Sequence, residues 1–141
     1  MEKLKILWID DDINNWALRP YIDTFNENGF EIIHAKDPDE SDRILTKSKD
    51  FRCIIIDLMM ATGSKISHEE SKGGIQTGLI LLQKLMADES LSNIKKVIFT
   101  KINDLETKNF CNVQEPAIPY LKKLDDTTGG FVDKIKLIIN N

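Results

Sequence analysis

The chain has 141 residues and a formal net charge of −4; 41% of its residues are hydrophobic and 30% are charged. These values are typical of one globular domain with a sizeable buried core. They argue against nucleic acid as the main partner, because no basic stripe offsets the acidic balance. They also argue against a membrane protein, because no apolar run approaches the ~20 residues of a membrane-spanning helix.

The N-terminal segment and the cysteines bear on the cellular compartment. MEKLKILWIDDD holds a short apolar run that ends in three acids, which is not the pattern of a signal peptide. Cys53 and Cys111 show no metal-ligand spacing, and we therefore expect reduced thiols. Cytoplasm is the expected location.

Short apolar runs alternate with segments of helical periodicity along the chain. Each run is short enough for a strand that is buried on both faces. The predicted strands are LKILWI (Leu4 to Ile9), FEIIHA (Phe30 to Ala35), FRCIIID (51–57), KKVIFT (95–100) and AIPYLKK (117–123). The predicted helices cover residues 13–28, 37–47, about 75–86, 103–110 and about 128–139.

Two prolines refine these predictions. Pro20 interrupts the apolar stripe of the first helix, so this helix either begins late, with Pro20 in its first turn, or kinks there. That stripe consists of Ile13, Ala17, Tyr21 and Phe25. Pro119 lacks a backbone donor, which places the fifth strand at an edge of the sheet.

Strand and helix alternate five times, which predicts an α/β fold with a parallel sheet between two layers of helices. We expect residues 1–141 to form this one domain. The polar segment TGSKISHEESKGG, in a loop at about 61–74, is interpreted as an insertion within it. A loop at strand ends can act as a lid, but the polar composition favours a mobile surface loop.

Acidic residues directly follow two of the predicted strands. Asp10, Asp11 and Asp12 end the first strand, and Asp57 ends the third, in CIIIDLMM. An unpaired buried charge is costly, so a carboxylate there needs a partner or a metal ion. In the strand order 2-1-3-4-5, strands one and three are neighbours where the order reverses, and the four carboxylates converge. Mg²⁺, a hard cation that prefers oxygen ligands, suits such a cluster best.

Two more polar residues end strands at the same edge. Thr100 closes VIFT, and Lys123 closes the fifth strand. A hydroxyl and an ammonium beside a metal-bound carboxylate suit a phosphoryl group, and carboxylates can themselves form aspartyl phosphates. Strand alternation lets only one of the two adjacent lysines enter the site, and the spacing from Tyr120 favours Lys123 over Lys122.

The ordered set KILWIDDD, CIIIDLMM, VIFT and YLKK resembles the receiver domains of two-component response regulators over essentially the whole chain. The resemblance implies a flavodoxin-like, doubly wound, five-stranded sheet in the order 2-1-3-4-5. It also implies that Asp57 accepts the phosphoryl group and contributes to the Mg²⁺ site. Asp11 would bind the ion directly, Asp10 through water, and Met59 through its backbone carbonyl.

The same resemblance assigns the remaining roles. Lys123 would pair with the phosphoryl group, Thr100 would be the switch hydroxyl, and Tyr120 would change rotamer with it. Such domains accept the group from a sensor histidine kinase or histidine phosphotransfer protein and catalyse only their own phosphorylation and dephosphorylation. The implied output is a contact with a downstream protein partner on the face of the fourth helix, fifth strand and fifth helix.

Three positions depart from the family pattern. Ala61 and Leu124 stand where prolines are usual, and Leu124 thereby replaces the proline that usually forms a cis bond after the lysine. Lys101 stands where a small residue usually guards the phosphoryl entrance. These departures and the long loop keep a receiver-like interaction module without phosphorylation as an alternative.

A haloacid-dehalogenase-type phosphohydrolase is the second alternative, with Asp10 as its nucleophile, although Asp57 would then have no role. Other polar or aromatic residues have simpler explanations. Asp12 can be no more than a helix cap. We expect His34 and His68 to fill surface or core positions, and Trp8 and Trp16 to lie in or near the core.

Overall fold

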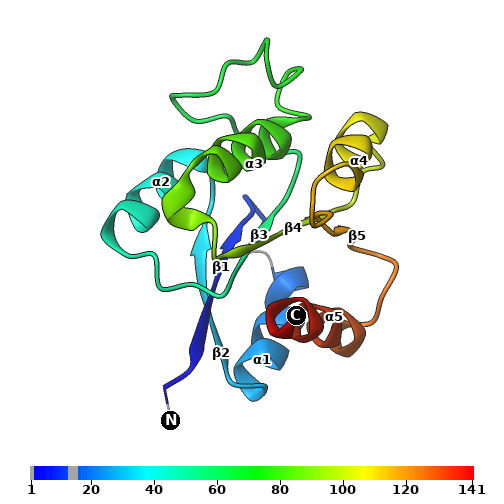
Figure 1. Ribbon diagram of the computed structural model, residues 1–141. Helices are drawn as coiled ribbons and strands as arrows, with labels where there is room; N and C mark the ends of the chain where they lie inside the picture. Colours follow the sequence, from blue (N-terminus) through cyan, green and yellow to red (C-terminus); the bar gives the residue numbers. More distant parts are fainter. Residues whose placement is uncertain (1, 13–15) are drawn as a thin grey trace.

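A computed structural model describes residues 2–12 and 16–141, with a central sheet between two layers of helices (Figure 1). The strands are β1 (Leu4–Ile9), β2 (Phe30–Ala35), β3 (Cys53–Ile56), β4 (Lys95–Thr100) and β5 (Tyr120–Lys122). The α-helices are α1 (Arg19–Glu27), α2 (Pro38–Lys47), α3 (Thr77–Ala87), α4 (Leu105–Asn112) and α5 (Thr128–Asn140). Two short 3-10 helices are η1 (Trp16–Leu18) and η2 (Glu89–Leu91).

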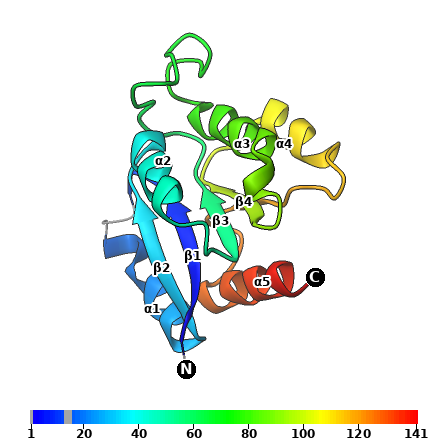
Figure 2. The ribbon, with the colours of Figure 1, turned by 60° about the vertical axis from the view of Figure 1, so that its left-hand side comes forward.

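The strands are all parallel and lie in the order β2-β1-β3-β4-β5, as predicted. β5 is at an edge, directly after Pro119. Helices α1 and α5 cover one face, while α2, α3 and α4 cover the other (Figures 1 and 2). The doubly wound fold is therefore confirmed, and it brings β1 and β3 together where the strand order reverses.

Successive side chains of a strand point to opposite faces of the sheet, so the central strands contribute to a hydrophobic core on each face. In β1, Leu7 and Ile9 face α2 and α3, while Ile6 and Trp8 face α1 and α5; all four side chains are fully buried. The second core is rich in aromatic rings around Trp8, including Tyr21, Phe25, Phe99 and Phe131. Because both faces of the central strands are buried, their sequences are apolar throughout.

The first helix begins late. Residues 16–18 form η1, and α1 follows with Pro20 in its first turn, which is one of the two predicted arrangements. Ile13 lies outside the described residues. The prediction for Trp8 is confirmed, but that for Trp16 is wrong: Trp16 is 85% exposed, because η1 turns Leu18 toward the core instead.

The connection from β3 to α3 is long, and its tip projects beyond α3 (Figure 1). Part of it is nonetheless packed into the domain, because Thr62, Ile66 and Ser71 are buried and Ile66 joins the core beneath α2 and α3. Helix α3 begins at Thr77, two residues later than predicted. None of the described helices is long and apolar enough to cross a membrane.

Candidate functional site

Backbone hydrogen bonds at the carboxyl ends of the strands place the acidic residues side by side. The amide of Asp10 donates to Ala35 (2.9 Å), and the amide of Asp57 donates to Ile9 (3.0 Å), so each ladder continues one residue beyond its strand. Between β4 and β5, the amide of Lys123 donates to the carbonyl of Thr100 (2.9 Å). The hydrogen bonding of the sheet thus fixes the backbone positions of Asp10, Asp57 and Lys123.

One buried ion cluster joins three of these residues. The Lys123 Nζ atom lies 2.6 Å from Oδ2 of Asp10 and 3.3 Å from Oδ2 of Asp57, and all three side chains are at most 8% exposed. The other oxygen of Asp57 accepts a hydrogen bond from the amide of Leu58 (2.8 Å). A single ammonium therefore pairs with two buried carboxylates, which offsets the cost of burying them.

The charges in this cluster perturb one another. Burial raises the pKa of Asp10 and the nearby Asp57 carboxylate raises it further, against the opposing effect of Lys123. Burial tends to lower the pKa of Lys123, but attraction to the two carboxylates prevails and raises it above the ordinary value. The ammonium form is thus secure, while the carboxylates still repel each other.

A second acidic group lies at the same edge. Asp10, Asp11 and Asp12 each offer one oxygen, and these oxygens lie within 4.8 Å of one another. The pKa of Asp11 is raised by partial burial and then by the neighbouring charges of Asp12 and Asp10. A divalent cation would relieve this repulsion, and hard carboxylate oxygens are the ligands that Mg²⁺ prefers. This group holds two of the predicted ligands, Asp10 and Asp11, with Asp12 in place of Asp57, and its carboxylate oxygens are donors that fit Mg²⁺.

The predicted switch residues lie beside the cluster. Thr100 is buried, and its hydroxyl accepts a long hydrogen bond from the Ile102 amide (3.4 Å). The Tyr120 hydroxyl donates to the carbonyl of Ile102 (2.6 Å) and accepts from the amide of Asp104 (3.1 Å). Tyr120 is thereby bonded to the segment between β4 and α4, which begins directly after Thr100.

These groups open into a cavity of about 500 Å³ at the carboxyl edge of the sheet. Its lining includes the predicted Asp11, Asp57, Met59, Thr100 and Lys123. Asp10 lies behind the cavity wall, fully buried, and Tyr120 lies outside the lining. The cavity is wide enough for a phosphoryl group together with a hydrated cation.

Several lining residues were not predicted. His68, Gly73 and Gly74 come from the long β3–α3 connection, whereas Lys101, which also lines the cavity, was expected at its entrance. His68 is exposed, as expected of a surface histidine, yet it faces this cavity. The Gly-Gly pair at the end of the polar insertion was the available signal, because adjacent glycines allow backbone to approach a site closely.

Two further predictions concern the neighbourhood of Lys123. Lys123 enters the site while Lys122 is only half-buried, in agreement with the choice made from the spacing from Tyr120. Among the described residues, the bond between Glu115 and Pro116 is the only cis peptide, so the bond from Lys123 to Leu124 is trans. Leu124 itself is 84% exposed.

No family model and no curated protein matches this chain. Solved structures do match it. A response regulator from Thermotoga maritima is 16% identical, with a TM-score of 0.69 and 99% of each chain covered. A response regulator receiver domain protein from Clostridium thermocellum is 25% identical, with a TM-score of 0.70, 97% of this chain covered and 94% of the other.

A two-component response regulator from Clostridium difficile is 21% identical, with a TM-score of 0.72, and the match covers 99% of this chain and 98% of that one. Together with the parallel sheet in the order 2-1-3-4-5, these matches show that the chain has the fold of response regulator receiver domains over nearly its whole length.

Proposed function

We propose that this protein is a phosphorylatable receiver in which Asp57 accepts a phosphoryl group from a histidine kinase or a histidine phosphotransfer protein. The observation that carries the proposal is the buried contact of one lysine with carboxylates from two strand ends, Asp10 and Asp57, beside an open cavity. An ammonium in this position can pair with phosphoryl oxygens as they arrive.

Asp10, Asp11, Asp57 and the backbone carbonyl of Met59 would hold Mg²⁺. When bound, the ion would neutralise charge on the phosphoryl oxygens during transfer. The perturbed pKa values of Asp10 and Asp11 support this assignment, because both carboxylates are destabilised as anions without a cation. Thr100 would donate a hydrogen bond from its hydroxyl to a phosphoryl oxygen.

The transfer is a substitution at phosphorus. An oxygen of the Asp57 carboxylate attacks, a P–O bond forms, and the bond from phosphorus to the donor's imidazole nitrogen breaks with its electron pair on that nitrogen. Lys123 then exchanges its contact with Asp57 for a phosphoryl oxygen while it keeps Asp10 beside it. Attack by water on the same phosphorus returns Asp57 and releases phosphate.

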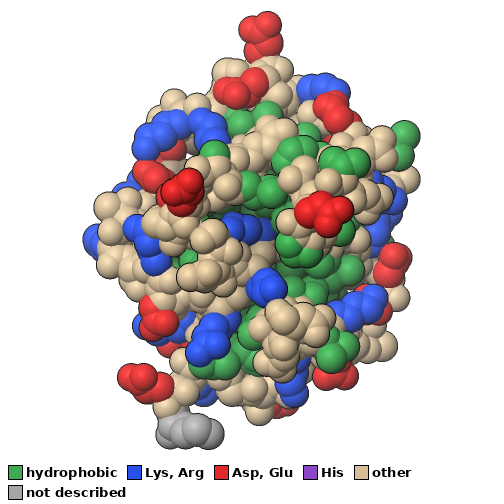
Figure 3. All heavy atoms as spheres, viewed as in Figure 1, with side chains coloured by type: hydrophobic (Ala, Val, Ile, Leu, Met, Phe, Trp, Pro, Cys, Tyr) green, Lys and Arg blue, Asp and Glu red, His purple; other side chains and the backbone are tan. Residues whose placement is uncertain are grey.

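The signal would pass to a downstream protein on the face of α4, β5 and α5. Figure 3 shows hydrophobic side chains gathered in a hollow at the amino ends of β4 and β5, beside the C-terminal ends of α4 and α5. The lining includes Met86, Pro116, Ala117, Ile118, Pro119 and Ile138. Tyr120 lies at one end of this surface and is bonded to the segment after Thr100, so a rearrangement there can reach it.

Labelling with acetyl phosphate and Mg²⁺ tests the proposal. Asp57→Asn should abolish the acid-stable, base-labile label, whereas Asp10→Asn should lower its yield but leave it on Asp57. Loss of label only in Asp10→Asn would instead identify a haloacid-dehalogenase-type nucleophile. Absence of label in the unmodified chain, together with no response to Mg²⁺, would identify an interaction module without phosphorylation.

A further inference from the structure

The long connection between β3 and α3 bridges two distant parts of the molecule. We define residues 61–76 as the strap. Its first half is attached to α2, and its second half to the start of α4, so it passes along the rim of the proposed phosphorylation site. Thr62, Ile66, Ser71 and Gln76 are buried along its length, which packs it onto the domain.

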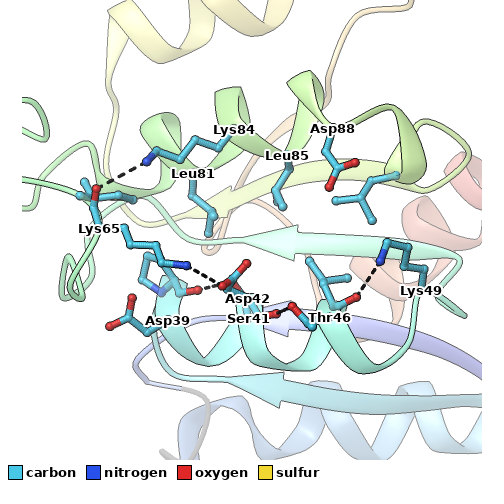
Figure 4. A pocket seen from close by; sticks show the side chains of 14 residues that line it. Asp39, Ser41, Asp42, Thr46, Lys49, Lys65, Leu81, Lys84, Leu85 and Asp88 are labelled. Atoms are coloured by element: carbon cyan, nitrogen blue, oxygen red, sulfur yellow. Dashed lines mark hydrogen bonds and ion pairs between the residues drawn. The ribbon is translucent and has the colours of Figure 1, made fainter.

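The attachment to α2 consists of polar contacts at the helix surface. The Ser64 amide and hydroxyl donate to Asp39 (2.8 and 3.1 Å), and the Lys65 ammonium lies 2.8 Å from Asp42. Figure 4 shows Lys65 reaching Asp42 beside the groove between α2 and α3, with Lys84 directed at the carbonyl of Lys65. Among the described residues, this end of the strap makes no hydrogen bond or ion pair with α4, and it therefore offers a matched control.

The attachment to α4 is more buried. Gln76 is 3% exposed, and its side-chain amide donates to Asp104 (3.0 Å) and Glu106 (3.3 Å). Lys72 adds an exposed ion pair with Glu106 (2.8 Å), which alone contributes little to stability. The buried amide is therefore the main contact, because each bond goes to a charged acceptor.

Asp104 connects this attachment to Tyr120. Its carboxylate caps α4 by accepting from the Thr107 amide (3.1 Å) as well as from Gln76, and its own amide donates to the Tyr120 hydroxyl. Within this attachment, between Lys72 and Gln76, the strap backbone at Gly73 and Gly74 lines the cavity that contains Asp57. Lys72, Gly73 and Gly74 all have positive φ, which turns the backbone toward that cavity.

We propose that the strap is a clamp that holds the start of α4, and with it Tyr120, in the conformation of the unphosphorylated protein. The proposal rests on the function proposed above. In this structure Lys123 is still paired with Asp10 and Asp57, as it must be before a phosphoryl group takes its ammonium. A contact that stabilises only this conformer opposes the shift to the phosphorylated one, and its removal favours that shift.

Beryllofluoride, which stands in for the phosphoryl group on a carboxylate, provides the test. Gln76→Ala and the double variant Gln76→Ala/Lys72→Met should bind beryllofluoride with Mg²⁺ about 5-fold more tightly than the unmodified chain. They should also exchange amide hydrogens faster over residues 103–110. Lys65→Met, which cuts the attachment to α2, should change neither quantity.

The outcomes separate the clamp from the function on which it rests. Two results would overturn the clamp but leave the proposed function standing. One is the same beryllofluoride affinity in all variants, and the other is weaker binding in the Gln76 variant. Faster exchange without a change in affinity would overturn it too, since the contact would then be only structural. An unmodified chain that fails to bind beryllofluoride at all would overturn both proposals.

Discussion

At the scale of single residues, the central feature is the imbalance of charge around Lys123. Asp10 and Asp57 share one ammonium, and Asp11 and Asp12 add two more carboxylates at the rim. Removing a partner from a buried ion pair leaves an uncompensated charge, so the lysine is indispensable to the unliganded site. The excess of negative charge is the property that would favour a divalent cation.

Asp11→Asn should expose this imbalance. The pKa of Asp11 is raised in the folded protein, so the folded state binds the proton more readily than the unfolded chain does. The contribution of Asp11 to stability therefore falls as pH rises from the ordinary value of 3.8 through the raised value. With EDTA at pH 7, the variant should therefore have a slightly higher Tm than the unmodified chain. The gain is small because solvent screens this partly exposed carboxylate.

Addition of Mg²⁺ should reverse the order of the two Tm values, so that the unmodified chain becomes the more stable. The unmodified chain should gain about 2.7 kcal/mol at a concentration 100 times its Kd, whereas Asp11→Asn should gain much less. Thermal unfolding with EDTA and with Mg²⁺ checks both halves, and Asp133→Asn, which removes an exposed acid of α5, is the control. Equal Mg²⁺ stabilisation of both chains would contradict a role for Asp11 in holding the ion.

At the scale of elements, the start of α3 fixes the position of Asp57. The Gly78 amide donates to the carbonyl of Leu58 (2.9 Å), and a Cβ atom at Gly78 would lie 2.0 Å from the Asp57 carbonyl oxygen. Only glycine lets the helix approach the backbone after β3 this closely. The first turn of α3 is thus packed directly against the acceptor residue.

Gly78→Ala should therefore be strongly destabilising. We expect a loss of about 3 kcal/mol in the free energy of unfolding, because backbone must move to admit the methyl group. Gly129→Ala in α5 is the matched control: its Cβ would meet open space, and the better helix propensity of alanine should leave stability equal or up to about 1 kcal/mol higher. Urea denaturation measures both, and equal stabilities would refute the close approach at Gly78.

The elements also show which predictions local sequence supports. The alternating apolar strands and the late start of α1 at Pro20 depend on local rules and were predicted. The exposure of Trp16 was not, because it depends on how η1 meets α1 rather than on the hydrophobicity of the ring. Gly78 gave no signal either, since a glycine near a helix start is common and only the packed backbone reveals its role.

At the scale of the whole molecule, the fold itself gathers the site. Asp10, Asp57, Thr100 and Lys123 are separated in sequence, but each ends or directly follows a parallel strand, and the carboxyl ends of these strands meet at one edge. Strand order and strand-end chemistry were enough to predict that gathering. Among the strap's contributions, Gly73 and Gly74 left a signal in the sequence as an adjacent glycine pair, whereas His68 could not be predicted, because a polar insertion has no periodicity that fixes its path.

The most direct measurement is a crystal structure of the chain with Mg²⁺ and beryllofluoride. We predict beryllium bonded to one Asp57 oxygen, the ion held by Asp10, Asp11, the other Asp57 oxygen and the carbonyl of Met59, and Lys123 and Thr100 in contact with fluorines. Beryllofluoride absent from Asp57 under saturating conditions, or Lys123 unchanged between Asp10 and Asp57, would contradict the account.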